Sequence, residues 1–245
     1  MKSLFYIIVT ILFSQAVLAQ QQFISQGRIE YERKTNQHAL MSESNFFDEL
    51  TKSKLPKFVT FYYDLFFKDD RTLFKAGREP EIKQVKTWNV FASENTVLTS
   101  LDSNLSLTQR VIFGSAYQVS DSVRHIDWRI TPEIRKIAGF DCRKAVGRIM
   151  DSVVVIAFYT DEILTTGGPE SVNGLPGMIM GLAIPRFHTT WYATKLALID
   201  VTGKELEMPK KGKKMTGNEY RSQLTDILKN WGDETEKKLR NQLLL

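Results

Sequence analysis

The stretch GGPESVNGLPGMIMGL, Gly167 to Leu182, decides how the middle of the chain must fold. Five Gly and two Pro within sixteen residues predict sharp bends, because Gly tolerates positive φ and Pro fixes φ near −65°. Leu175 to Met178 fits a type II turn, with Pro176 at the second position and Gly177 at the third. Met178 to Ile184 is apolar at both sets of alternating positions, which predicts a strand buried on both faces.

Strand patterns continue on the N-terminal side of this stretch. Residues 27–34 alternate between charged and apolar side chains, with Ile29 and Tyr31 on the apolar face. Residues 58–77 predict a hairpin turning at Asp69-Asp70, and its aromatic side chains Phe61, Tyr63 and Phe67 share one face with Leu65. Those aromatic residues form the core of a one-sided sheet, or line a ligand cavity in an incomplete barrel.

Further strands are expected between residues 87 and 199. Ile134 to Ala145 predicts a hairpin that turns at Ala138-Gly139, where Gly139 supplies the positive φ of a tight turn. Residues 151–160 are rich in β-branched and aromatic side chains, as strands are. Phe187 to Ile199 is a long amphipathic strand.

Two segments have helical patterns. Ser42 to Lys54 predicts a short helix that Pro56 closes. At the other end, Thr216 to Glu219 is a capping box, T-x-x-E, followed by an apolar stripe on residues 220, 224, 227, 228 and 231. Gly232 interrupts this pattern, and the last residues are expected to fray or to dock weakly. The fold class predicted is mainly β, a curved antiparallel sheet or open half-barrel with a short N-terminal helix and a C-terminal helix.

The N-terminus has the pattern of an export signal. Lys2 precedes the apolar run Leu4 to Phe13, and Val17 and Ala19 place small residues at the −3 and −1 positions, so cleavage is expected after Ala19. The apolar run is too short to span a bilayer, and no transmembrane segment is expected once the signal is removed. The predicted divisions are 1–19 signal peptide, 20–203 antiparallel β domain, 204–215 basic linker and 216–245 C-terminal helical segment.

Composition narrows the classes of partner. The net charge is +5, and +4 without Lys2, with acidic and basic residues interleaved, so no nucleic-acid partner is expected. The densest basic run is Pro209 to Lys214, interpreted as a solvated linker, with contact to anionic lipid or polysaccharide as the alternative. Cys142 is the only cysteine, which excludes an intramolecular disulfide and favours a small buried side chain.

Residues with catalytic or metal-binding potential are scattered. The three His, His38, His125 and His188, have no second His or Cys at metal-ligand spacing, and no nucleotide-binding or hydrolase motif is present. Adjacent carboxylates Asp161 and Glu162 point to opposite faces of a strand, which argues against a cooperating pair. No catalytic residue, metal or cofactor is therefore predicted.

The block from Trp128 to Leu182 resembles the GLPGLI family of exported proteins of the Bacteroidota. The name-giving motif is Gly174-Leu175-Pro176-Gly177-Met178-Ile179, with Met178 where the family has Leu. Upstream, Lys136 to Ala145 matches a basic-Ile-x-Gly-aromatic-x-Cys-x-Lys-Ala segment. Phe158 to Leu164, then Gly168-Pro169, matches Trp-Tyr-Thr-x-x-Ile-Pro before Gly-Pro, departing at Phe158 and Leu164.

The resemblance implies an exported protein in a Gram-negative setting, and it carries no catalytic residues to transfer. Family members often resemble accessory components that are encoded near TonB-dependent outer-membrane receptors. We therefore expect a periplasmic or outer-membrane-associated, non-enzymatic binding or accessory protein of the cell envelope, with an envelope protein or a hydrophobic ligand as candidate partner. The candidate binding residues are Tyr159, Gly174, Leu175, Pro176 and Gly177. Two alternatives stay open: a hydrolase using Cys142 or the Asp161-Glu162 region together with His125 or His188, and a self-associating surface protein.

Overall fold

The computed structural model describes residues 23–41, 50, 52–81, 94–112, 114–150, 152–230 and 232–245. Within these residues the chain forms one sheet of twelve strands, accompanied by helices at two places. The strands are β1 (Gln26–Asn36), β2 (Phe58–Lys68), β3 (Arg71–Ala76), β4 (Thr96–Ser100), β5 (Leu105–Ile112), β6 (Ser115–Ser122), β7 (Arg129–Ile137), β8 (Phe140–Ile149), β9 (Val153–Thr160), β10 (Met178–Ile184), β11 (Thr189–Ala197) and β12 (Lys213–Thr216).

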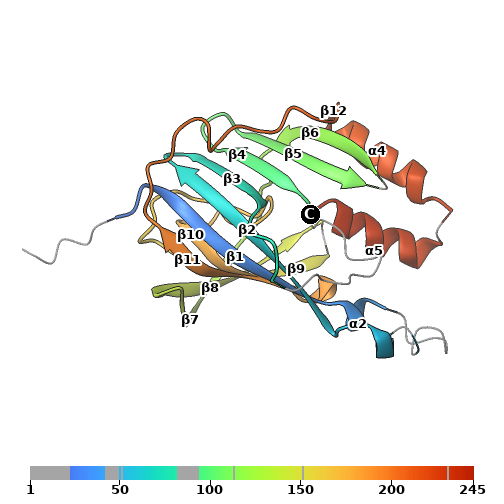
Figure 1. The fold of residues 1–245 in the computed structure, drawn as a ribbon, viewed down its shortest axis with the longest axis horizontal. Coiled ribbons are helices and arrows are strands. Elements are labelled where there is room, and N and C mark those ends of the chain that lie inside the picture. Colours follow the sequence, from blue (N-terminus) through green and yellow to red (C-terminus); the bar gives the residue numbers. More distant parts are fainter. Residues whose placement is uncertain are drawn as a thin grey trace, which may run out of the picture.

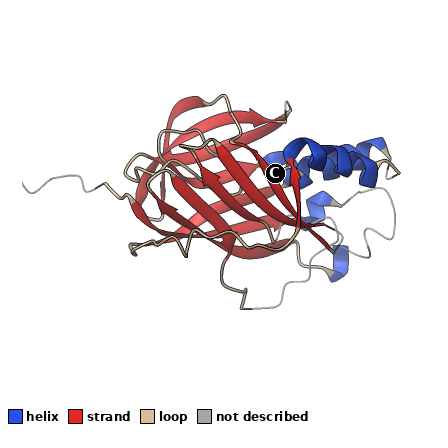
Figure 2. Ribbon diagram, turned by 90° about the horizontal axis from the view of Figure 1, so that it is seen from above, coloured by secondary structure: helices blue, strands red, loops and turns tan. Residues whose placement is uncertain are grey.

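The sheet is open, with strand order β12-β6-β5-β4-β3-β2-β1-β11-β10-β9-β8-β7. All neighbouring strands run antiparallel except β12, which pairs parallel to β6. Figures 1 and 2 show the sheet curling strongly around its concave side without closing. The mainly β prediction is confirmed, and the sheet is one open layer bent on itself.

Helices lie at two places beside the sheet. The C-terminal helical segment contains α4 (Gly217–Leu228) and α5 (Asp233–Leu243), which lie side by side at one end of the sheet (Figure 1). The predicted capping box is present, with the Thr216 hydroxyl accepting from the Glu219 N–H. A four-residue turn, α2 (Gln37–Leu40), follows β1, and η2 (Pro185–Phe187) links β10 to β11. The helix predicted over Ser42 to Lys54 falls mostly outside the described residues.

The predicted aromatic strand face is part of the core. Tyr63, Leu65 and Phe67 are fully buried, and Phe61 is half-buried. The rings of Tyr63 and Phe74 stack with centroids 4.8 Å apart. These side chains pack against one another in the hydrophobic core. The sequence left open whether they form a core or line a ligand cavity, and the structure shows that they form the core.

Strand β10 is buried on both faces, as its sequence predicts. A β-bulge between Ile179 and Gly181 interrupts its pairing with β9. Buried Tyr31 on β1 donates its hydroxyl to the carbonyl of Ile179 at 2.6 Å, and the Ile179 N–H donates to Gly167 at 2.8 Å. Both backbone groups of Ile179 therefore have partners at the bulge, as buried backbone polar groups require.

The loop ahead of β10 differs from the predicted type II turn. The Gly177 N–H donates to the carbonyl of Leu175 at 2.8 Å, which closes a three-residue γ-turn around Pro176. Gly177 does have positive φ, +141°. A Cβ at Gly177 would overlap the carbonyl oxygen of Thr160 on β9. The turn is tighter than predicted because Gly177 packs directly against the neighbouring backbone.

The hairpin between β7 and β8 confirms its predicted turn. Ala138 and Gly139 both have positive φ, +50° and +94°, as the central residues of a type I′ turn do.

The last residues of the chain do not fray, because Leu239, Leu243 and Leu245 are buried. Of the two outcomes expected there, fraying is wrong and docking is observed.

Replacing Gly177 by Ala should destabilise the protein by about 2–4 kcal/mol, because strained φ and steric overlap with Thr160 add together. The measurement is the free energy of unfolding from urea denaturation. Gly203→Ala is the matched control, since a Cβ at Gly203 meets no atom within 4 Å. Equal stability of the two variants would contradict the close packing described for Gly177.

Candidate ligand-binding cavity

A cavity of about 550 Å³ lies between strands β5 and β6, helix α4 and the C-terminal residues. Its size suits a small molecule, since ligand pockets are typically about 300–1,000 Å³. Strand β8 and the loop before β10 contribute to its wall. The lining residues are Ser106, Thr108, Arg110, Val119, Asp121, Ser122, Arg124, His125, Asp127, Arg148, Ile149, Met150, Ser171, Gly217, Tyr220, Arg221 and Leu244.

Strand β5 presents its polar side chains to the interior. Ser106, Thr108 and Arg110 alternate along the strand, are only 5–7% exposed and line the cavity. Val111, on the opposite face, is 44% exposed. Alternate residues of a strand share a face, so this strand has the reverse of the usual apolar-inside pattern. Neither hydroxyl of Ser106 and Thr108 has a hydrogen-bond partner among the described residues.

Two arginines of the cavity hold the C-terminal residues. Arg110 donates to the carbonyl of Leu243 at 2.9 Å, and Arg124 donates to the carbonyl of Leu244 at 2.7 Å. Burial, together with the nearby Arg110, lowers the pKa of Arg124 to about 10. Arg124 Nη1 is buried and has no hydrogen-bond partner in the described part of the chain.

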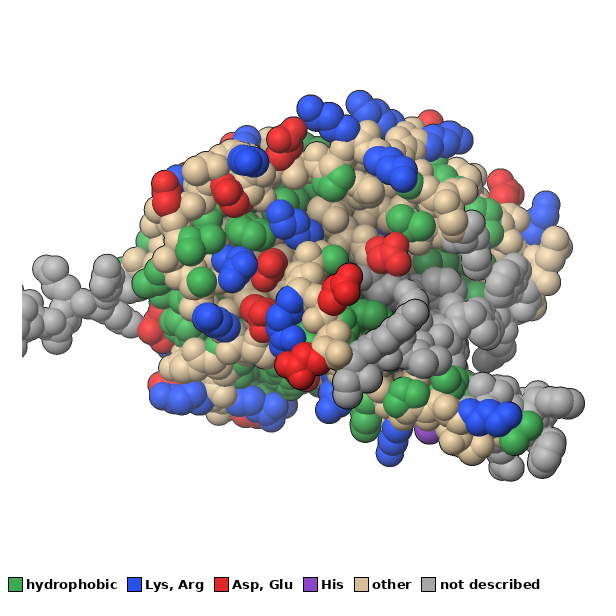
Figure 3. Space-filling view, viewed as in Figure 1, with side chains coloured by type: hydrophobic (Ala, Val, Ile, Leu, Met, Phe, Trp, Pro, Cys, Tyr) green, Lys and Arg blue, Asp and Glu red, His purple; other side chains and the backbone are tan. Residues whose placement is uncertain are grey.

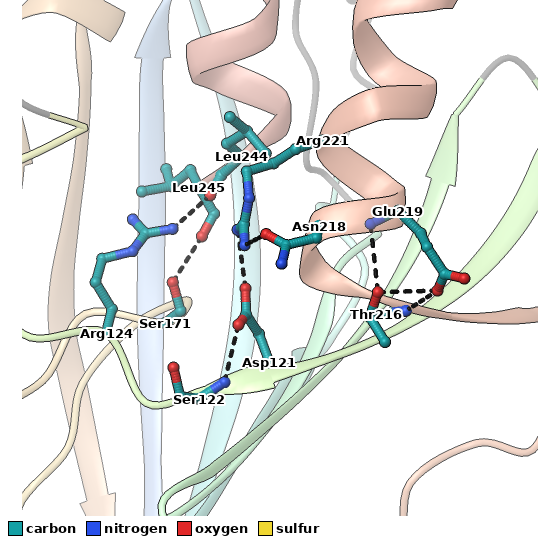
Figure 4. Close-up of polar contacts among 10 residues, drawn as sticks. All are labelled: Asp121, Ser122, Arg124, Ser171, Thr216, Asn218, Glu219, Arg221, Leu244 and Leu245. Carbon is teal, nitrogen blue, oxygen red and sulfur yellow. Dashed lines mark hydrogen bonds and ion pairs between the residues drawn. The ribbon is translucent and has the colours of Figure 1, made fainter.

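The start of helix α4 forms another part of the wall (Figure 4). Arg221 on α4 forms an ion pair with Asp121 on β6 at 2.9 Å and also donates to Asn218. The Asp121 carboxylate lies against Gly217, at the first position of the helix. Negative charge is favoured at a helix N-terminus, so Asp121 and Arg221 fix the helix on the sheet.

The glycine-rich stretch Gly167 to Leu182 contributes Ser171 to the cavity. Its hydroxyl donates to the backbone oxygen of Leu245 at 2.8 Å (Figure 4). The preceding residue, Glu170, has positive φ of +56° and is 2% exposed. Asn95 donates to the Glu170 carboxyl at 3.0 Å. Burial raises the pKa of Glu170, and the charge of Arg33 opposes that shift.

None of the candidate binding residues from the sequence lines this cavity. Tyr159, Leu175 and the strand that follows belong to the core. Gly174 packs near the Trp128 indole, whose Nε1 donates to Asn173 at 2.9 Å. Pro176 and Gly177 form the γ-turn. The same loop reaches the cavity through Ser171, four residues before Leu175.

Sequence reasoning missed most of the cavity wall. The alternation of Ser106, Thr108 and Arg110 with Leu105, Leu107 and Val111 indicates a strand with one polar face, but it does not determine which face turns inward. The contributions of Arg124 and of the C-terminal residues depend on tertiary contacts more than a hundred residues apart along the chain. No local pattern encodes such contacts.

The side chains of the hydrolase alternative do not line the cavity, apart from His125. Cys142 is fully buried, and its thiol donates weakly to the carbonyl of Phe140 at 3.5 Å. His125 is exposed and contacts Asp127 at 3.1 Å. Among the described residues, no group of three or more His, Cys, Asp or Glu is placed to hold a metal ion.

The outer surface mixes both signs of charge, as Figure 3 shows for one face. Lys213 and Lys214 of the basic run Pro209 to Lys214 are exposed and belong to β12. In the described part of the chain, no helix is long and apolar enough to cross a bilayer.

Comparisons with known proteins identify a fold likeness only. No family model matches the chain, and no curated protein is significantly similar to it in sequence. PNGF-II, solved in space groups C2 and P21, superposes with TM-scores of 0.54 and 0.53 at 14% identity, covering 81% of this chain and 32% of PNGF-II. This chain therefore spans about a third of that protein. An uncharacterized conserved protein from Thermus thermophilus superposes with a TM-score of 0.40 at 7% identity, covering 83% of this chain and 98% of that protein.

The Cys142 thiol should be unreactive in the folded protein. Burial raises its pKa to about 12, so at pH 8 roughly one thiol in ten thousand is the reactive thiolate. We expect no modification by iodoacetamide in native buffer and complete modification in urea, measured by intact mass. Rapid alkylation of the folded protein would show that Cys142 is accessible and would reopen the thiol alternative.

Proposed function

We propose that this chain is an exported, non-enzymatic binding protein of the bacterial cell envelope, and that its ligand occupies the cavity beside β5. The observation that carries the proposal is the inward polar face of β5. Hydroxyl and guanidinium groups that line a cavity can exchange hydrogen bonds with a bound molecule or water, so such a face is typical of a binding site. A periplasmic or outer-membrane-associated location follows from the export signal and from the resemblance to the GLPGLI family.

The character of the cavity favours a polar ligand over a hydrophobic one. Tyr63, Phe67 and Phe74 pack against each other in the core, and none of them lines the cavity. The cavity does contain apolar surface from Ile149, Met150 and Tyr220. A small molecule with polar groups on one side and a compact carbon skeleton matches this lining.

Binding is favoured over catalysis by the placement of the reactive groups. Cys142 is held as a neutral thiol in the core, away from the cavity wall. The cavity instead contains hydroxyl and guanidinium groups, which position ligands by hydrogen bonds. An accessory role beside an outer-membrane transporter is compatible with a protein that captures and hands over a small polar solute.

Self-association through the sheet edge has less support. Strand β7 is one edge of the sheet, and it exposes Ile130 and Ile134. The same strand contains Pro132 and the exposed charges Arg129, Glu133, Arg135 and Lys136. Prolines and charges on an edge strand disfavour pairing with another chain.

Export is tested by expressing the full chain in a Gram-negative bacterium and sequencing the N-terminus of the periplasmic product. We expect the mature protein to begin at Gln20. Ala19→Arg should block this cleavage, because signal peptidases need a small residue at the −1 position. A wild-type product that stays in the cytoplasm and retains Met1 would contradict export.

Ligand capture is tested by native mass spectrometry of the protein after incubation with a periplasmic small-molecule extract. We expect an adduct with the wild type and loss of that adduct in Thr108→Trp, which places a large ring in the cavity. The control is Val154→Trp, at a position on β9 that is already partly exposed and outside the cavity. An adduct retained equally by both variants would place the ligand elsewhere.

A further inference from the structure

The cavity wall carries more positive than negative charge. Its arginines are Arg110, Arg124, Arg148 and Arg221, and its acidic residues are Asp121 and Asp127. Asp121 is paired with Arg221, and Asp127 contacts His125. Arg110, Arg124 and Arg148 form no ion pair with a carboxylate within 4.0 Å among the described residues, and Asp121 acts on Arg124 only as a more distant opposite charge.

The hydrogen-bond partners of the two inner arginines are neutral. Arg110 and Arg124 donate to the carbonyls of Leu243 and Leu244, which supply acceptors without a counter-charge. Arg110 is 5% exposed, and the two guanidinium groups lie close enough that their charges repel. A buried charge without a counter-ion is costly, and neighbouring like charges add to the cost.

One buried acid, Glu170, interacts with Arg110 but is shared with another arginine. Glu170 interacts electrostatically with Arg110, but its interaction with Arg33 is stronger. Glu170 does not line the cavity. Glu170 therefore offsets part of the charge of Arg110 without lining the cavity, and the cavity wall at Arg110 remains positively charged.

We propose that the cavity binds a small organic oxyanion, with a carboxylate or phosphate group held between Arg110 and Arg124. This assignment rests on the proposed binding function and specifies its ligand class. Guanidinium groups bind both oxyanions through paired N–H donors, and the unpartnered Arg124 Nη1 would gain an acceptor if the side chain turned slightly toward the ligand. Ser106 and Thr108 lie along the same wall and would bind hydroxyl groups of the ligand. A sugar acid or a sugar phosphate combines these features.

The experiment compares three probes of similar size by isothermal titration calorimetry: glucose, glucuronate and glucose 6-phosphate. We expect glucose to bind weakly or not at all, and at least one of the two anions to bind measurably. A preference between glucuronate and glucose 6-phosphate distinguishes the carboxylate from the phosphate. Arg124→Gln should weaken binding of the preferred anion by about ten- to a hundredfold, the usual loss for one charged hydrogen-bonding partner.

Two further variants keep the test decisive. Arg148→Gln removes an exposed charge at the cavity, and we expect a several-fold loss of affinity with unchanged folding. Arg143→Gln removes the same charge from an exposed position on β8 outside the cavity, and we expect no loss. Melting curves of all variants show whether any of them is unfolded.

The outcomes separate this inference from the broader function. Equal binding of glucose and the anions, or unchanged affinity in Arg124→Gln and Arg148→Gln, would overturn the oxyanion assignment and leave a binding cavity. Capture of only neutral molecules from the periplasmic extract would do the same. Binding of none of the three probes, with an extract adduct that is anionic and lost in Arg124→Gln, would support the charge class and exclude these sugars.

Discussion

The packing of the 167–177 loop against strand β10 is the constraint on which the rest of the structure depends. Gly177 fits against the Thr160 carbonyl only because it has no side chain, and Ile179 receives the Gly167 carbonyl as a partner for its N–H. The loop therefore enters the curve of the sheet and does not pass over its outside. A loop buried in this way must satisfy its own backbone groups, which explains its demand for glycine and proline.

This constraint connects the core to the cavity. The loop that covers β10 also carries Ser171 to the C-terminal residues and Glu170 into the interior. Glu170 keeps a backbone conformation that is unfavourable for a side chain larger than Gly, about 1 kcal/mol or more above the relaxed state. The conformation persists because the chain is fixed on both sides of Glu170. Before it, the Gly167 carbonyl accepts a hydrogen bond from the Ile179 N–H, and after it, the Ser171 hydroxyl donates to Leu245. The Ser171 contact that helps to hold the strained loop also forms part of the cavity wall.

The parts of the fold that the sequence predicts are those with strong local periodicity, such as the hairpin at Ala138-Gly139, the burial of β10 and the capping box at Thr216. The γ-turn at Pro176 was not predicted, because the choice between it and a type II turn depends on Thr160, on another strand. The candidate site was missed for the same reason. The polar row of β5 looks like an ordinary solvent-facing row, and which face of an alternating strand turns inward depends on what covers it. Here α4 and the C-terminal residues cover the polar face.

The interior of the sheet accordingly has two regions with different physical demands. Around Tyr31, Tyr63 and Phe74 the packing is apolar and dense, and the buried hydroxyl of Tyr31 is satisfied by the bulge at Ile179. Around Arg110 and Arg124 the packing is open, and charge is held by neutral carbonyls. Apolar residues at the second region would bury the same area without charge repulsion or the unpartnered Arg124 Nη1, and so would stabilise the fold more. The polar region is not what holds the sheet together, which is why its chemistry is best explained by what enters the cavity.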